Sequence, residues 1–536
     1  MSKAIVLLAL LAAASAADNS SELTLTLLSD TIPAAKGGRC MDGSMTGYYF
    51  RQGVDTDTFV IFMHGGGGCT SQGTCKKWAA EKGSSKDFAR TQSGDHAGVA
   101  GGDCATNPYF CNATAAIVPY CTGDSHRGNR TVASEATFGW IFDGHASFVA
   151  VIEELISTRG LGKAKRVLLT GSSAGGIGVF YNLDWLAARL PGADVKGAPM
   201  AGWFFPAALP GDLADVYPPS DFSHFNAGTH GNQFNDPSQL QAYVALYDMR
   251  GVFSADCMAA QPAGQWWACF SVHKQYPYVK TPVFVIENQF DTSQIYAADG
   301  HIPKQPTSAE AAAVQRYVAM YGEAMRNSTA QVLNNASVAK KRVPDGLFLP
   351  SCFQHPVDVT EQIAPPGGPP QAWPLLLGDW FFEQNALQQY HRLVESCPTG
   401  LPCNPLPICK YTAGPSPGPA PAPGSCVAGL TKDGCLPNSE TDCETCAKAH
   451  ENDLKVVGCT PKAVQQLCKA GPSPGPSPGP TPAPTPGGCA AQFAKDDCLP
   501  NNQADCYHCV HKHKSDLDAA GCTSGEARKL CTAYTA

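Results

Sequence analysis

Apolar runs and helical periodicities alternate along residues 22–412. Short runs rich in Val, Ile, Leu and Phe, which are typical of buried strands, occur at 58–63, 167–169 and 281–286. Apolar residues at helical spacing occur at 144–160, 179–190, 309–325 and 383–395. Because strands that alternate with helices form parallel sheets covered on both faces, this region is predicted to be one α/β domain with a mostly parallel sheet.

The strand at 167–169 runs into a Gly-x-Ser-x-Gly motif, Gly171 to Gly175, with a helical pattern after it. Glycines two residues to either side of Ser173 remove the Cβ atoms that would clash in a sharp strand-to-helix turn. Such a turn is the nucleophile elbow of α/β-hydrolase folds, where it exposes the serine hydroxyl at the edge of the sheet. The pattern also arises by chance in glycine-rich loops, but the flanking strand and helix favour a nucleophilic Ser173.

Gly65 to Gly68 form a glycine run directly after the predicted strand at 58–63. Glycine lets the backbone approach a ligand closely and present N–H groups where side chains would otherwise intervene, as an oxyanion hole requires. In α/β-hydrolase folds one donor comes from a glycine motif after the third strand and another from the residue after the nucleophile. The expected oxyanion donors are therefore Gly66, Gly67 and Ala174. In isolation, the run is also typical of a flexible loop.

An acid and a histidine follow Ser173 in the chain order that α/β-hydrolase folds use. Asp291 comes just after the predicted strand at 281–286 and is the expected acid, with Glu287 as the nearer alternative. An aspartate at this position is also typical of a turn or a helix cap. His355 is the expected base, and a disulfide at Cys352 in the same loop would help to hold its imidazole in place.

Residues 69–121 contain five cysteines and many Gly, Asn and Thr, so disulfides are expected to hold a loop-rich region in shape. Asp124 and His126 follow it and are expected at the surface or at a pocket rim, because no strand-like sequence presents them. Three further histidines are expected to be surface residues: His145, His224 and His230.

Aromatic and turn residues from Trp203 to Asp236 are typical of pocket walls, although aromatic clusters more often belong to the core. Cys257 and Cys269 bracket a tryptophan pair and are expected to form a disulfide with each other.

The chain begins with a secretory signal peptide pattern over residues 1–16: a lysine, an apolar run and a small-residue cleavage site. No later run reaches the roughly 18 apolar residues of a membrane helix. The 24 cysteines of an exported chain are expected to form disulfides. The formal net charge of −8 comes without a basic block, which argues against nucleic acid as a partner. The glycosylation sequons suit a eukaryotic secretory route and begin at Asn19, Asn112, Asn129, Asn327 and Asn335.

Two proline-alternating tracts, 413–425 and 469–488, are predicted to be extended linkers. Each tract is followed by one copy of the same module, 426–468 and 489–531, and the six cysteines of the two copies share the same spacing. Each copy is too small for a sizeable core and is predicted to be a helical hairpin held by disulfides. Zinc is the alternative reading of each Cys-x-x-Cys, but an oxidising compartment favours disulfides.

Four sequence blocks occur in a recognisable order: Gly65–Cys69, Gly171–Gly176, Phe290–Ile295 and Ser351–His355. Together they resemble the pectin acetylesterase and Notum carboxylesterase family. The resemblance implies a secreted serine carboxylesterase with an α/β-hydrolase-like fold and no metal or organic cofactor.

The resemblance also implies roles for particular residues. Ser173, Asp291 and His355 would form the catalytic triad, and the three donors named above would form the oxyanion hole. This chain departs from the family at two positions: the family usually has an acidic residue where this chain has His64, and an aromatic residue near the position of Gly68. The pocket wall is therefore expected to be more open here.

The expected function is deacetylation of pectin-like or other acetylated polysaccharide in the extracellular space or cell wall. The two modules on proline-rich linkers resemble tethered carbohydrate-binding domains, although an inert protease-resistant tail or a protein-interaction tail fits the same layout. One alternative keeps the triad but removes a fatty acyl group from a protein, as Notum does, and a long apolar tunnel would favour it. Another is a non-catalytic wall or surface glycoprotein with a glycan-binding tail, which the presence of all three triad residue types disfavours.

Overall fold

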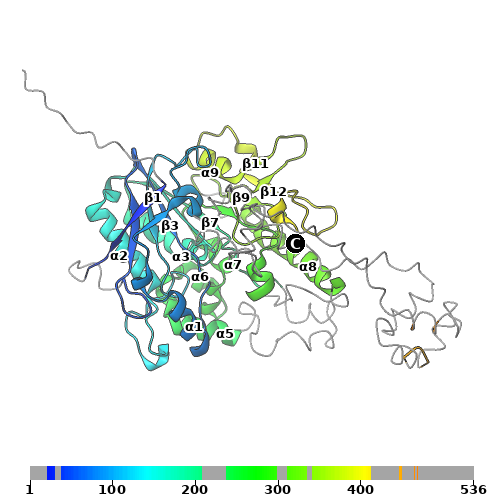
Figure 1. Cartoon of the computed structure of the whole chain (residues 1–536), viewed down its shortest axis with the longest axis horizontal. Helices are drawn as coiled ribbons and strands as arrows, with labels where there is room; N and C mark the ends of the chain where they lie inside the picture. The colour runs from blue at the N-terminus through cyan, green and yellow to red at the C-terminus, as the bar shows by residue number, and fades with distance from the viewer. Residues whose placement is uncertain are drawn as a thin grey trace, which may run out of the picture. The chain divides into compact units, whose positions relative to one another are not determined.

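The computed structural model describes residues 21–29, 38–207, 237–298, 311–334 and 341–411, and further along the chain only 446–448, 464 and 468. The chain forms two compact units, residues 1–417 and 418–536, and the coloured ribbon of Figure 1 belongs mainly to the first. Cys446 and Cys468 of the first repeat are disulfide-bonded. Several predictions lie outside the described residues: the signal peptide, both linkers, the fold of the repeats, His224, His230, Asn19, Asn335 and the aromatic segment beyond 207.

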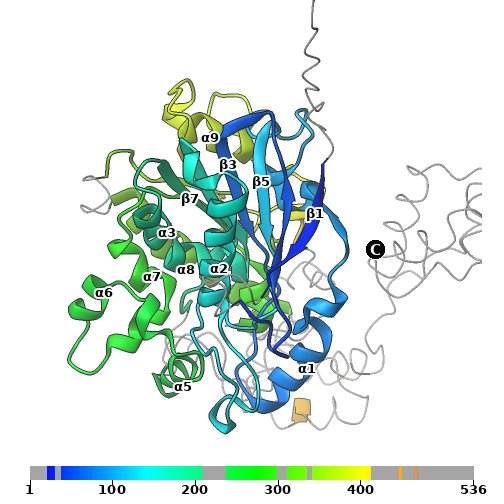
Figure 2. The ribbon, with the colours of Figure 1, turned by 90° about the vertical axis from the view of Figure 1, so that its left-hand side faces the viewer.

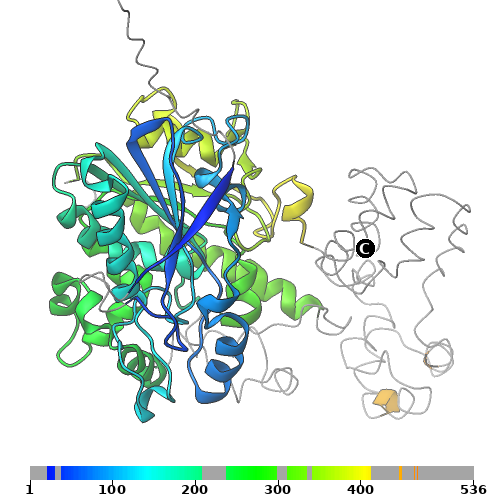
Figure 3. The ribbon, with the colours of Figure 1, turned by 60° about the vertical axis from the view of Figure 1, so that its left-hand side comes forward.

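Within the described residues, a ten-stranded sheet has the order β12-β9-β8-β7-β6-β3-β5-β2-β1-β4. Neighbours from β12 to β5 pair in parallel, and β5, β2, β1 and β4 pair antiparallel. In Figure 3 the dark blue β1 crosses its neighbours obliquely, as expected for a twisted sheet. The strands are β1 (Glu22–Leu27), β2 (Gly47–Arg51), β3 (Asp55–Met63), β4 (Thr91–Ser93), β5 (Ala113–Val118), β6 (Arg166–Ser172), β7 (Asp194–Met200), β8 (Phe284–Ile286), β9 (Gly346–Leu349) and β12 (Arg392–Val394).

Helices cover both faces of the sheet because alternate strand residues point to opposite sides. In β3, Phe59 and Ile61 join the apolar cluster that includes residues of α2 and α3, whereas Val60 and Phe62 join the cluster that includes residues of α9. Figure 2 shows α2 and α3 beside the same strands. The helices are α1 (Gln72–Lys82), α2 (Gly144–Thr158), α3 (Ala174–Arg189), α5 (Pro237–Tyr247), α6 (Ala255–Ala260), α7 (Val272–Gln275), α8 (Ala311–Asn334) and α9 (Trp373–Phe381).

The predicted α/β fold with a mostly parallel sheet is confirmed, and α2, α3 and α8 lie where helical spacing placed them. The predicted helix at 383–395 is wrong. Asp379 accepts the backbone N–H groups of Ala386 and Leu387 at 3.0 and 3.1 Å, and β12 then pairs with β9. Pairing with a distant strand therefore overrides the local periodicity.

The region 69–121 is more regular than its sequence indicates, since it contains α1 and β5. Helix α1 buries only Cys75 and Trp78, so its apolar signal is weak. Strand β5 is buried along its whole length between β3 and β2 and consists largely of small residues, which removes the alternation that marks a half-buried strand.

All twelve cysteines of residues 38–411 are paired, and the predicted Cys257–Cys269 bond and a disulfide at Cys352 are confirmed. The sequon residues Asn112, Asn129 and Asn327 are exposed. None of the described helices combines the length and apolar character needed to cross a membrane. The disulfides are Cys40–Cys121, Cys69–Cys75, Cys104–Cys111, Cys257–Cys269, Cys352–Cys409 and Cys397–Cys403.

Candidate active site

The residues singled out in the sequence converge at the carboxyl ends of β3, β6, β8 and β9. The glycine run follows β3, Ser173 follows β6, Asp291 comes after β8 and His355 after β9. These strands belong to one parallel array, so their carboxyl ends meet at the same edge of the sheet. The topology therefore brings together side chains up to 182 positions apart in the chain.

Ser173, His355 and Asp291 form one chain of hydrogen bonds. The Nδ1 atom of His355 lies 2.6 Å from Oδ2 of Asp291, and its Nε2 atom lies 2.9 Å from Oγ of Ser173. Asp291 is fully buried, and its Oδ1 accepts the backbone N–H of Gln294 at 2.9 Å. With Nδ1–H held by the carboxylate, Nε2 of a neutral imidazole is an acceptor for the serine proton.

Ser173 has a backbone conformation that non-glycine residues rarely adopt, with φ 57° and ψ −120°. It is the N-cap of α3, and its N–H donates to the Met200 carbonyl at 2.9 Å. A Cβ on Gly175 would lie 2.0 Å from the Met63 carbonyl oxygen, so only glycine fits there. The turn is thus held in a strained form by the strands on either side of β6.

Burial and the charge of Asp291 together shift the pKa values of its two titratable neighbours. Burial lowers the pKa of His355, but the charge of Asp291 and its hydrogen bond together outweigh burial, and the pKa is raised above 6.5. Glu287, the alternative acid, is fully buried, and burial together with the charge of Asp291 raises its pKa well above the usual range. Its Oε2 accepts the Trp203 N–H at 2.7 Å. Asp291, rather than Glu287, therefore contacts the imidazole.

The glycine loop after β3 is oriented through its carbonyl groups. Nε2 of His126 donates to the His64 carbonyl at 2.8 Å, and Nε1 of Trp78 donates to that of Gly66 at 3.0 Å. The Tyr120 hydroxyl donates to the Gly67 carbonyl at 2.9 Å. Because C=O and N–H point in opposite directions across a trans peptide, anchoring the Gly66 carbonyl also fixes the direction of the Gly67 N–H.

A cavity of about 230 Å³ opens beside Ser173. Gly67 and Ala174 line it, whereas Gly66 is not among its lining residues. A Cβ on Gly67 would meet no atom within 4 Å, so the cavity wall is open at this glycine. Helices α1 and α5 lie at this end of the domain in Figures 1 and 2. The lining residues are Gly67, Gly68, Thr70, Gly123, Ser125, Arg127, Ser173, Ala174, Ile177, Phe204, Tyr243, Tyr247, Phe270 and Ser293.

Asp124 and His126 were expected at the surface or at a pocket rim. Both are buried, so the surface alternative is wrong, and their chain neighbours Gly123, Ser125 and Arg127 line the cavity. They follow β5, whose strand character the sequence conceals, and that strand delivers them to the site edge. His145 is partly buried and lies 2.7 Å from the Asn182 Oδ1 atom. Phe204 does line the cavity, as expected. Arg127 was not among the residues singled out in the sequence, although it directly follows His126.

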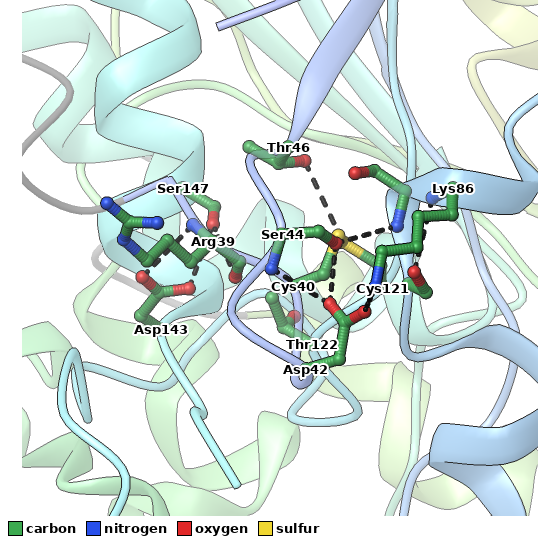
Figure 4. Close-up of a disulfide and its surroundings, with 12 residues drawn as sticks. Arg39, Cys40, Asp42, Ser44, Thr46, Lys86, Cys121, Thr122, Asp143 and Ser147 are labelled. Atoms are coloured by element: carbon green, nitrogen blue, oxygen red, sulfur yellow. Dashed lines mark hydrogen bonds and ion pairs between the residues drawn. A yellow bond between two sulfur atoms is a disulfide. The ribbon is translucent and has the colours of Figure 1, made fainter. Parts of the chain in front are cut away.

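Disulfides anchor two of the site loops. The Cys40–Cys121 disulfide joins an N-terminal turn to the segment that runs from Cys121 to Arg127. Figure 4 shows this bond with its neighbours. Cys352–Cys409 holds the loop of His355. Among the described residues, one group of potential metal ligands consists of Cys352, Cys409 and Glu361. Its two cysteines are bonded to each other, so neither offers a thiolate.

Comparison with known proteins shows extended similarity. The model of the Pectinacetylesterase family matches residues 16–407. The chain is 27% identical over 380 residues to the palmitoleoyl-protein carboxylesterase NOTUM of Homo sapiens, covering 69% of each protein. It is 28% identical over 404 residues to pectin acetylesterase 11 of Arabidopsis thaliana, covering 69% of this chain and 89% of that protein.

A solved structure of the Wnt deacylase Notum from Drosophila has a TM-score of 0.55 and 25% identity, covering 72% of this chain and 99% of that one. The chain spans between 43% and 69% of the length of the animal Notum relatives given in these comparisons.

Proposed function

Because the chain belongs to the pectinacetylesterase family and is a carboxylic ester hydrolase, we propose that it is a secreted serine esterase that removes acetyl groups from extracellular polysaccharide. The observation that carries this proposal is the hydrogen-bonded chain of Ser173, His355 and Asp291 beside a cavity. Secretion is supported by the predicted signal peptide and by six disulfides, which persist in oxidising compartments.

The proposed mechanism uses side-chain and backbone groups of this chain. His355 takes the proton of the Ser173 hydroxyl as Oγ attacks the ester carbonyl, and Asp291 holds the imidazole in the required tautomer. The N–H groups of Gly66, Gly67 and Ala174 stabilise the oxyanion, with Ala174 helped by the positive end of α3. His355 then returns the proton to the leaving sugar hydroxyl, and water hydrolyses the acyl-enzyme.

The size of the cavity favours a short acyl group over a fatty one, although apolar and aromatic side chains also line it. Its volume of about 230 Å³ lies below the roughly 300 Å³ at which typical small-molecule pockets begin. Its lining also includes polar groups from Thr70, Ser125 and Arg127. Burying a hydrocarbon chain against such groups would leave them without water or other partners. These features favour acetyl esters over palmitoleoyl esters, the fatty acyl esters after which the Notum relatives are named.

The C-terminal repeats are proposed to bind the same polymer and raise the local substrate concentration. Full-length protein and a chain ending at residue 412 would be compared for retention on insoluble cell-wall polysaccharide. Equal retention of both would count against glycan binding by the repeats.

Hydrolysis of acetyl, butyryl and octanoyl nitrophenyl esters by the wild type and Ser173→Ala tests the proposed function. We expect the wild type to prefer acetyl and to release acetate from acetylated polysaccharide, and Ser173→Ala to be inactive. Preference for octanoyl would favour a fatty acyl substrate. Equal inactivity of both proteins on every ester would indicate a non-catalytic glycoprotein.

A further inference from the structure

The side chain of Arg127 lies in the same cavity as Ser173, yet its residue is only 3% exposed. Nη1 donates to the Phe270 carbonyl at 3.0 Å. The guanidinium carbon lies 4.2 Å from the centroid of the Phe270 ring and 4.9 Å from that of Tyr181. Two aromatic rings thus hold a positive charge in place beside the candidate nucleophile.

No carboxylate in the described part of the chain pairs with this guanidinium, and its Nε atom is buried without a hydrogen-bond partner. Asp124, the acid nearest in sequence, already uses both oxygens. They accept from the Thr122 hydroxyl and from the backbone N–H groups of His126, Gly128 and Gly144. A buried cation without a paired anion is costly unless a ligand supplies the anion.

The backbone before Arg127 is held in an unusual form. Ser125 and His126 both have left-handed φ values, 57° and 56°. The amide of Asn182 donates to the His126 carbonyl at 2.9 Å, and Tyr120 accepts the Ser125 N–H at 2.7 Å. Strained residues held by many bonds are typical of positions where a side chain must be placed accurately.

We propose that Arg127 binds an anionic group, a carboxylate or a sulfate ester, on the sugar whose ester reaches Ser173. This inference rests on the proposed function and names a specificity-determining residue for it. A guanidinium presents planar, permanently charged N–H donors that suit such oxyanions. The enzyme would then select acidic polysaccharide esters over neutral ones.

The first test uses the wild type alone, so it does not depend on any variant folding. The substrates are acetylated polygalacturonate, the same polymer with its carboxylates methyl-esterified, acetylated xylan and acetylated dextran sulfate. We expect kcat/KM on the free-acid polymer to exceed that on the methyl-esterified polymer by about tenfold or more. Preference for the dextran sulfate arm would identify sulfate as the anion. Equal rates on all four polymers would overturn the proposal.

The second test compares Arg127→Gln, Arg127→Lys and the matched control Arg130→Gln. Arg130 donates to the Ala245 carbonyl at 2.8 Å and is not among the cavity-lining residues. The measured quantity is the ratio of kcat/KM on the anionic polymer to that on the methyl-esterified one. It should fall toward one in Arg127→Gln, be intermediate in Arg127→Lys and stay at the wild-type value in Arg130→Gln.

An unchanged ratio in Arg127→Gln would refute the proposed role of Arg127 and leave the proposed esterase function untouched. The proposed function fails separately, if Ser173→Ala still hydrolyses nitrophenyl acetate at the wild-type rate.

Discussion

Replacing Gly175 by alanine should damage the candidate active site through the backbone of its neighbour. The new Cβ would lie 2.0 Å from the Met63 carbonyl oxygen and 2.6 Å from the Met63 carbonyl carbon. Real Cβ contacts are essentially never shorter than 3.0 Å, so the Met63 carbonyl or the turn must move by about 1 Å. Met63 is the last residue of β3 and leads into the glycine loop, so no flexible side chain can absorb the clash.

Two magnitudes follow from this displacement. Overpacking of a tight site costs about 1–3 kcal/mol of unfolding free energy. A misplacement of about 1 Å in a reacting geometry lowers the rate by roughly a hundredfold. Gly175→Ala should therefore lose far more activity than stability, since the clash acts on Ser173 and on the expected oxyanion donors together.

The assay is kcat/KM for nitrophenyl acetate alongside the thermal midpoint of unfolding. The matched control is Gly73→Ala in α1, where a Cβ would meet no atom within 4 Å. Alanine there should keep wild-type activity and leave the thermal midpoint unchanged or slightly higher, because alanine favours the helix more than glycine does. If Gly175→Ala folded and hydrolysed the ester at the wild-type rate, the steric account of the elbow would be refuted.

Four further predictions concern two titrating groups, the acid beside His355 and a disulfide. Because the pKa of His355 is raised, kcat/KM should fall as pH decreases through a value above 6.5, and a pH profile with no acidic limb would contradict this. Asp291→Asn should lower kcat/KM by roughly ten-thousand-fold, because the imidazole would lose the carboxylate that holds its tautomer. Burial raises the pKa of Asp143, which is labelled in Figure 4, from 3.8 to about 7. Between these two pH values the folded state keeps a proton that the unfolded state has released, so the free energy of unfolding should fall by up to about 4 kcal/mol as pH rises from 3.8 to 7. Urea unfolding at several pH values should show this slope in the wild type and a smaller one in Asp143→Asn. Replacing Cys352 and Cys409 together by serine should cost about 4 kcal/mol, measured by unfolding without reductant, and equal stability would count against the disulfide.

Much of the site was predictable because its requirements are local. Gly171 and Gly175 are needed by the steric limits of one turn, and those limits act within a few residues of Ser173. Ser173, Asp291 and His355 converge because the strands that precede them are parallel and end at one edge of the sheet. The structure brings these three side chains together as the sequence indicated.

Other features depend on contacts between distant segments and were not readable from local patterns. Strand β5 carries no alternation because it is buried on both faces, so the positions of His126 and Arg127 stayed hidden. The segment 383–395 has helical spacing, yet pairing with β9 makes part of it a strand. Both Asp291 and Glu287 are fully buried, and the structure distinguishes them by their partners: Asp291 contacts the imidazole of His355, whereas Glu287 accepts the Trp203 N–H.

The sequence by itself thus determined the α/β fold class and the strand-to-helix turn at Ser173, and it indicated an acid and a histidine downstream of that turn. Only the tertiary structure decided how the cysteines other than Cys257 and Cys269 pair, what lines the cavity and where the charge of Arg127 lies. The physical reason is the range of the interactions involved. Steric limits of a turn are set by neighbouring residues, whereas burial and charge pairing are set by whichever distant segments the fold packs against a side chain.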